Sequence, residues 1–282
     1  LGGNLDANGN SIVSVSNANI VIAPNGTGKV DINGNLDVDG GTIKLDGNYP
    51  VGTDNVALGN TALDSVEAGG INNVAIGDNA GTAITTGDCN TAVGKDALDA
   101  STTASYNTAI GFNSLTTNTT GNLNTAVGMG SAQQNTEGTN LVAVGARALE
   151  QNETGSCNTA LGKNSLLSNT TASSNTAVGF ESLKTNTTGD KNTALGTGAL
   201  AANTTAGCNT AVGQASLCTN TTGCLNTAVG RQALEVNLTG DNNTGLGYRA
   251  LNANTSADNN TAVGFCSLAA NTTANNNTAL GF

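Results

Sequence analysis

Histidine and tryptophan are absent from this chain, and only 2% of its 282 residues are aromatic and 10% charged. The lack of histidine removes the commonest general base and metal ligand. The scarcity of large apolar side chains excludes an ordinary close-packed globular core. Acidic residues are scattered, so the paired carboxylates of a carbohydrate-cleaving enzyme are also missing. We therefore expect no enzyme, no catalytic residue, and no bound cofactor or metal.

Basic residues are also scarce: nine lysines and arginines stand against 20 acidic residues, which gives a net charge of −11. The basic side chains are spread singly, whereas binding to phosphate backbones requires clustered ones. No apolar run approaches the roughly 20 residues of a membrane-spanning helix. We therefore expect neither a nucleic-acid partner nor membrane insertion. Because the chain starts at Leu1 and stops one residue past a repeated glycine, we expect a fragment of a longer protein.

A unit close to Asn-Thr-Ala-Val-Gly recurs fourteen times between Asn55 and Phe282. After a first step that is one residue longer than the others, its closing glycine returns with a strict 17-residue period. These column glycines are Gly59, Gly77, Gly94, Gly111, Gly128, Gly145, Gly162, Gly179, Gly196, Gly213, Gly230, Gly247, Gly264 and Gly281. A fixed period of this size is typical of stacked repeats. We predict an all-β protein whose residues 54–282 form a β-solenoid or β-roll of fourteen coils.

The residues before each column glycine form columns of their own. Asn stands four before it in thirteen copies, with Leu141 as the exception, and Ala stands two before it in thirteen, with Gly245 as the exception. The position directly before the glycine is always Val, Ile or Leu. Three before it, eleven copies have Thr, and Val56, Val74 and Val142 replace it in the others.

Alternation along a strand places the Thr/Val and Val/Ile/Leu columns on one face and the Ala column on the other. Because Thr exchanges with Val, we predict that the first face points into the coil. There, Leu four residues after the glycine, as in Leu98 and Leu183, closes the layer. The small Ala face then allows close approach of another chain. The predicted inter-chain face consists of Ala92, Ala109, Ala126, Ala160, Ala177, Ala194, Ala211, Ala228 and Ala262.

The remainder of the repeat predicts turns. Asn-Thr-Thr followed by Gly or Ala recurs, for example at residues 118–121 and 186–189. Asn, Thr and Gly favour turns because they bond to their own backbone or adopt left-handed dihedrals. These Asn-x-Thr triplets also match the N-glycosylation acceptor. Their recurrence in coil after coil favours a structural Asx-type turn.

The six cysteines do not form an obvious disulfide framework. Cys89, Cys157 and Cys208 share one repeat position but lie four and three repeats apart, so stacked coils keep them separate. Cys218 and Cys224 flank one turn and could pair. We expect most of the six to be free thiols that act as small apolar residues, which suits assembly in a reducing cytoplasm.

The first part of the chain differs from the rest. Residues 1–53 contain short alternating runs separated by Pro24-Asn25-Gly26, Asn33-Gly34 and Gly40-Gly41. Such runs are typical of short strands joined by tight turns. We predict a short-strand β shaft segment over 1–53, followed by the solenoid.

The repeats resemble those of known fibrous proteins. Asn-Val-Ala-Ile-Gly at residues 73–77, which other copies follow with x-x-Ser/Ala-Leu, resembles the head repeats of trimeric autotransporter adhesins, which form stacked β-rolls. The longer form, Asn-Thr-Ala-Val-Gly-x-x-Ser/Ala-Leu-x-x-Asn-Thr-Thr-Gly, resembles the tail-fibre repeats of marine tailed phages more closely. Residues 40–50 and 22–32 are also similar to phage fibre and trimeric viral shaft segments. The 17-residue period departs from the shorter adhesin repeat.

This resemblance implies a structural protein of the virion. It would be a rigid homotrimeric tail-fibre shaft that supports attachment to a host receptor. Its partners would be two further copies of itself, other virion or fibre proteins, and a host surface glycan or protein. The strand asparagines would form a ladder of side-chain amides. A trimeric adhesin on a bacterial cell surface is an alternative with the same architecture.

Two further hypotheses concern exposed columns. The residue after each column glycine is often large, and Phe112, Phe180, Tyr248 and Phe265 could stack on sugars or instead line a protected groove. Flat β-solenoids with regular Thr columns can also bind ice. Because Val replaces Thr in its column, we predict that these Thr side chains point inward, which argues against ice binding.

Overall fold

The computed structural model describes residues 54–282, and the predicted shaft segment 1–53 lies outside the described residues. Every repeat contributes one strand of three residues, because only the positions between the strand Asn and the column glycine are extended. The strands are β1 (Val56–Leu58), β2 (Val74–Ile76), β3 (Thr91–Val93), β4 (Thr108–Ile110), β5 (Thr125–Val127), β6 (Val142–Val144), β7 (Thr159–Leu161), β8 (Thr176–Val178), β9 (Thr193–Leu195), β10 (Thr210–Val212), β11 (Thr227–Val229), β12 (Thr244–Leu246), β13 (Thr261–Val263) and β14 (Thr278–Leu280).

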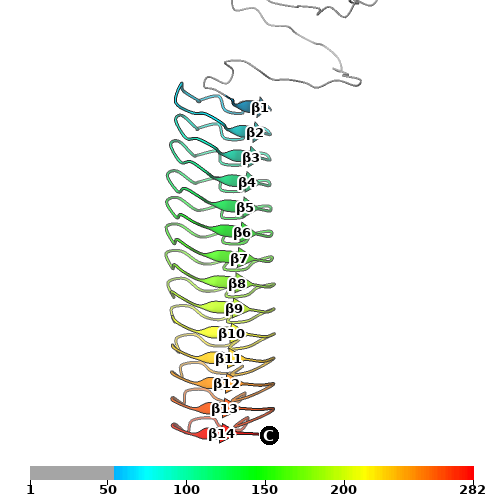
Figure 1. Cartoon of the computed structure of the whole chain (residues 1–282), viewed down its shortest axis with the longest axis vertical. Helices are drawn as coiled ribbons and strands as arrows, with labels where there is room; N and C mark the ends of the chain where they lie inside the picture. Colours follow the sequence, from blue (N-terminus) through cyan, green and yellow to red (C-terminus); the bar gives the residue numbers. More distant parts are fainter. Residues whose placement is uncertain (1–53) are drawn as a thin grey trace, which may run out of the picture. The chain divides into compact units, whose positions relative to one another are not determined.

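These strands form one parallel sheet in sequence order, so consecutive coils lie directly above one another (Figure 1). The register pairs equivalent residues, as in Thr176 with Thr193 and Ala177 with Ala194. No helix, and hence no membrane-spanning helix, occurs within residues 54–282. The predicted all-β solenoid with a 17-residue period is confirmed.

The core of most coils is built around the leucine four residues after the column glycine, as predicted; Gly81 and Ala132 occupy this position in the coils of Gly77 and Gly128. These core leucines have at most 1% of their surface exposed, and Leu268 near the end is partly buried. They are Leu63, Leu98, Leu115, Leu149, Leu166, Leu183, Leu200, Leu217, Leu234 and Leu251. Since this leucine supplies most of the apolar volume where it is present, the interior strand position beside it must be small.

The predicted inter-chain alanines lie inside the coil, so that assignment was wrong. All nine are at most 1% exposed within the single chain and cannot contact another copy: Ala92, Ala109, Ala126, Ala160, Ala177, Ala194, Ala211, Ala228 and Ala262. Packing against the core leucine explains their size. At Gly245, which occupies the same column, an added Cβ would lie 3.5 Å from Cγ and Cδ1 of Leu234. The interior therefore has room for a methyl group and little more.

The prediction that Thr and Val point inward was wrong for the same reason. Thr176 and Thr193 are exposed, and the side chains directly before the glycine are half-exposed, with Leu161 and Leu195 each at 45%. The exchange of Thr for Val thus reflects a β-branched position on the outer surface of a strand.

Each coil closes within one repeat because several positions adopt left-handed backbone conformations. In the coil of Gly179, the glycine has a φ of 133°, Glu181 of 55° and the core leucine Leu183 of 51°. The residue before the next strand asparagine, Lys191, has a φ of 59°. Non-glycine residues rarely adopt this region, so neighbouring coils must hold them there.

Two asparagine columns join the coils. The corner asparagines, seven residues after the column glycine, donate from Nδ2 to the backbone three residues on and to the preceding corner asparagine. For Asn186, these bonds run to Gly189 O (3.0 Å) and to Asn169 Oδ1 (3.1 Å). This confirms the predicted turn. It also buries the asparagines of the corner glycosylation triplets, such as Asn118 and Asn186, which are 0% exposed, although Asn271 near the end is partly buried.

The strand asparagines form a different ladder. Their Oδ1 accepts the backbone N–H of the same position in the next coil, as Asn192 Oδ1 does from Asn209 (3.0 Å), while Nδ2 donates to a carbonyl of the next coil, here Ala206 (2.8 Å). Leu141 interrupts this column and is equally buried. Amide-to-amide bonds of the predicted kind join only some strand asparagines, such as Asn243 to Asn226 (3.1 Å), whereas in the corner column they run without a break from Asn118 to Asn271.

Candidate interaction surface

The outward side of the sheet is the most regular surface that the structure describes. We call it the outer sheet face, formed by the Thr/Val and Val/Ile/Leu columns of β1 to β14. Its aliphatic column is exposed where Leu or Ile occupies it, as at Leu58 (50%), Ile110 (40%) and Leu195 (45%), and partly buried where Val does. Sequence reasoning missed this surface, although the strict restriction of one column to Val, Ile and Leu was visible. Such a continuous apolar stripe is typical of an interaction surface.

The threonine hydroxyls of the outer sheet face have no hydrogen-bond partner among residues 54–282. Threonines at the coil corners behave differently, since Thr187 Oγ1 donates to Thr204 O (3.0 Å) and Thr119 Oγ1 to Thr136 O (3.0 Å) in the next coil. The strand threonines, such as Thr176 and Thr193, are thus free to bond to water or to another molecule.

The residues five and six positions before each column glycine lead into the strands and form what we call the amino edge. At the position six before the glycine, the side chain can accept the backbone N–H of the equivalent residue in the preceding coil. Asp241 Oδ1 accepts from Cys224 (2.7 Å), and Asp258 Oδ1 accepts from Asp241 (2.7 Å). These bonds fix the carboxylates on the surface.

The residues one and two positions after each column glycine leave the strands and form the carboxyl edge. The predicted aromatic stripe lies here: Phe112 and Phe180 are 48% and 46% exposed, and neither has an aromatic neighbour in the adjacent coils. Tyr248 stacks on Phe265 with ring centroids 5.1 Å apart, and Phe265 stacks on Phe282 at 5.4 Å. Because this stacking covers the ring faces of Phe265, mainly its ring edge is left for a ligand.

Two arginines flank the stacked rings. The guanidinium carbons of Arg231 and Arg249 lie 6.0 and 5.9 Å from the centroid of the Tyr248 ring, at the outer range of cation–π contact. Neither arginine forms an ion pair with a carboxylate in residues 54–282. This end of the carboxyl edge is therefore basic and aromatic on an otherwise acidic chain.

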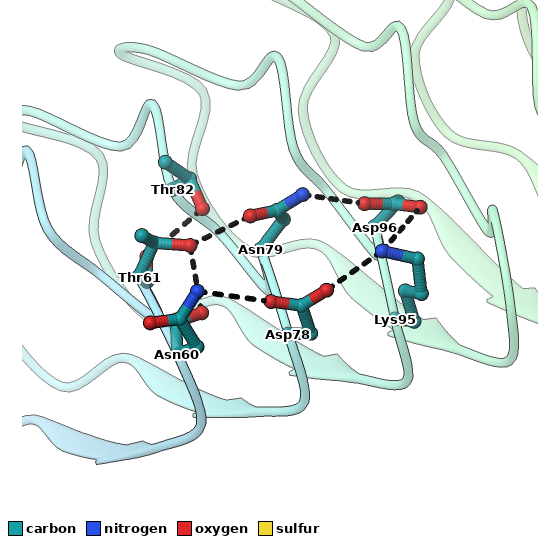
Figure 2. Close-up of polar contacts among 7 residues, drawn as sticks. All are labelled: Asn60, Thr61, Asp78, Asn79, Thr82, Lys95 and Asp96. Carbon is teal, nitrogen blue, oxygen red and sulfur yellow. Dashed lines mark hydrogen bonds and ion pairs between the residues drawn. The ribbon is translucent and has the colours of Figure 1, made fainter.

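The opposite end of the carboxyl edge is a network of satisfied polar groups (Figure 2). Lys95 Nζ lies 2.7 Å from Asp78 Oδ2 and 3.7 Å from Asp96 Oδ2, and Asn79 donates to Asp96 Oδ1 (2.9 Å). The hydrogen bond between Lys95 and Asp78 lowers the pKa of the carboxyl and raises the pKa of the amine. These exposed charges are thus paired within the chain and link neighbouring coils.

The described residues offer little for metal or thiol chemistry. No group of three or more Cys, Asp or Glu side chains in residues 54–282 could hold a metal ion. All six cysteines are free; Cys89, Cys157 and Cys208 are exposed instead of acting as buried apolar residues. Burial, followed by the charge of Glu235, raises the pKa of Cys218, which makes its thiol less reactive.

In comparisons with known proteins, no protein-family model matches this chain, and no similar sequence is found among curated proteins.

Proposed function

We propose that this chain is a rigid shaft segment of a homotrimeric fibre whose copies associate through the outer sheet face. The half-exposed aliphatic stripe on every coil carries this proposal. Association would remove it from water, at about 25 cal/mol for each Å² of apolar surface buried. The shared 17-residue period means that two copies present matching columns along their whole length.

The size of the outer sheet face fits such an interface. Fourteen strands ~4.8 Å apart, each three residues of ~3.3 Å long, give a surface on the order of 650 Å². Stable interfaces use about 800 Å² from each partner. The surface thus lies at the lower end of the range for specific contacts, about 600 to 1,000 Å² from each partner, and association would add buried apolar area to a thin coil.

The biological setting of this proposal follows from the resemblance of the repeats to phage tail fibres. In that setting the chain belongs to the virion, contacts other fibre proteins, and holds a recognition tip away from the particle. A host glycan or protein would be bound chiefly by that tip. A bacterial surface adhesin would use the same shaft.

Sedimentation equilibrium of the chain and two matched variants tests the association. Leu195 and Leu238 are equally exposed, at 45% and 44%, but Leu195 lies on the outer sheet face and Leu238 at a coil corner. We expect a trimer for the unchanged chain and for Leu238→Lys. Leu195→Lys should weaken association about 100-fold, since an ammonium replaces a buried aliphatic at a cost of ~3 kcal/mol. A monomeric unchanged chain, or equal effects of both substitutions, would contradict the proposal.

We propose ice binding as a second candidate, because the Thr column points outward with unbonded hydroxyls. The inward orientation that argued against it is overturned. A flat row of hydroxyls ~4.8 Å apart beside aliphatic groups could order water. Thermal hysteresis that is lost in Thr176→Lys with Thr193→Lys, measured on a monomeric chain, would support this function over the fibre. No hysteresis from the unchanged chain would exclude it.

A further inference from the structure

The two edges of the outer sheet face carry opposite charge. The amino edge holds five acidic residues and one lysine, namely Asp54, Asp88, Asp190, Asp241 and Asp258 with Lys191. The carboxyl edge holds five basic residues and three acidic ones, namely Lys95, Arg147, Lys163, Arg231 and Arg249 with Asp78, Asp96 and Glu181. The separation is complete in the coils of Gly230, Gly247 and Gly264, where the amino edge has no base and the carboxyl edge no acid.

The charged edge residues of these last coils also lack ion-pair partners within residues 54–282. Elsewhere on the carboxyl edge, Arg147 pairs with Glu150 at 2.7 Å and Glu181 with Lys184 at 2.9 Å within the chain. By contrast, Arg231, Arg249, Asp241 and Asp258 form no ion pair in the described part of the chain. Two acidic and two basic side chains thus remain available on opposite edges: Asp241 and Arg249 share the coil of Gly247, while Arg231 lies one coil before it and Asp258 one coil after it.

The symmetry of an assembly decides which edges meet. When copies are related by a rotation axis along the stack, the amino edge of each copy lies next to the carboxyl edge of its neighbour, coil by coil. When two copies run in opposite directions and face each other across an axis perpendicular to the stack, like edges meet. Parallel association therefore brings opposite charges together, whereas antiparallel association brings acid to acid and base to base.

We infer that the two edges direct copies of this chain into a parallel assembly. In it, Asp241 of one copy faces Arg249 of the next in the same coil, and Arg231 and Asp258 lie one coil, ~4.8 Å, to either side of that pair. This inference rests on the proposed association through the outer sheet face and specifies its orientation. Complementary charge contributes chiefly specificity and association rate, and like charges brought together are unfavourable.

The local structure prepares both sides for this pairing. The carboxylates are held in place by the backbone N–H groups of Cys224 and Asp241, and each keeps its second oxygen unbonded. The two arginines lie close to the Tyr248 ring. Asp241 and Arg249 are thus held on opposite edges of one coil, that of Gly247.

Neutral and exchanged variants test the role of the charges. Asp241→Asn with Asp258→Asn keeps the acceptor for the backbone N–H, because Asn275 already accepts one in this column (2.8 Å). We expect this variant to associate at least about tenfold more weakly at low salt, with the difference shrinking near 1 M salt, where charges are screened beyond ~3 Å.

Arg231→Glu with Arg249→Glu should also weaken association. Adding Asp241→Lys and Asp258→Lys to that variant should restore association, because the acidic and basic residues have then exchanged edges. Circular dichroism controls for folding.

Energy transfer between chains labelled enzymatically at the C-terminus with donor or acceptor reports orientation. The dye pair should have a Förster radius shorter than the stack, which is ~65 Å long. We expect efficient transfer, as parallel copies require. Assemblies with low transfer, or assemblies indifferent to the charge variants, would overturn this inference while leaving the proposed fibre intact. A monomeric unchanged chain would overturn both.

Discussion

Gly179→Ala is expected to lower the free energy of unfolding by about 3 kcal/mol or more. A Cβ on Gly179 would lie 2.7 Å from the carbonyl carbon and oxygen of Gly196 in the next coil, so the two coils could not keep their spacing. Its φ of 133° is also a region that side chains strongly disfavour. Urea unfolding followed by far-UV circular dichroism measures the effect. Because stacked repeats can unfold in parts, hydrogen exchange in flanking coils should also increase.

Gly198→Ala is the matched control for this substitution. Gly198 also has a positive φ, of 66°, but nothing lies within 4 Å of the position that its Cβ would take. The same column holds Glu181 and Ala215 in the adjacent coils, each with a φ of 55°. Only the left-handed backbone opposes the methyl group, so we expect a cost of about 1 kcal/mol. Equal destabilisation by the two substitutions would show that the coil spacing at the column glycine differs from the one described.

Asn186→Ala is expected to cost about 3 to 4 kcal/mol, the second large effect. The side chain is fully buried and donates to Gly189 O and Asn169 Oδ1, while its own Oδ1 accepts from Asn203 Nδ2 (2.8 Å). Its loss removes three hydrogen bonds and leaves buried polar groups of its neighbours unsatisfied. Thermal and urea unfolding measure the change.

Thr187→Ala provides the comparison at the adjacent position. Its Oγ1 makes one bond to the next coil, to Thr204 O at 3.0 Å, and it is only partly buried. Water can replace that bond, so we expect a cost below about 1 kcal/mol. If Asn186→Ala were no worse than Thr187→Ala, the corner asparagine ladder would not be a main source of coil-to-coil stability.

The period, strands, turns and core leucines could be predicted because each follows from local pattern. A fixed 17-residue spacing, a three-residue β-branched strand and an Asn-Thr-Thr-Gly corner all act within one coil or its neighbour. Leu183 and its equivalents were identifiable as the recurring large apolar residues between the strand and the corner. The all-β solenoid therefore needed no knowledge of distant contacts.

The orientation of the strand faces could not be read from alternation alone. Alternation separates Ala177 from Thr176 and Val178, but it does not say which set lies inside. We assigned the larger residues to the interior, as in ordinary cores. The three-dimensional structure decides which face lies inside, because the core leucine already fills the coil opposite the strand, as the contact between position 245 and Leu234 shows. A thin coil therefore selects the smallest residue for its interior strand position.

The charged edges became visible only after the faces were placed. Asp241 and Arg249 lie on either side of one strand, and their sequence separation gives no reason to relate them. Once the strand between them is known to present Thr and Leu outward, they become the two borders of one surface. The sugar-stacking hypothesis changed for a related reason, since Tyr248 and Phe265 come from successive coils and stack on each other.

A cryo-electron microscopy structure of the purified chain tests the central claim most directly. The account predicts parallel copies around a common axis, with the Thr and Val/Ile/Leu columns of β1 to β14 turned toward that axis and Ala177 inside each coil. A single isolated solenoid, or an assembly whose copies meet through the coil corners while the outer sheet face remains in solvent, would contradict it.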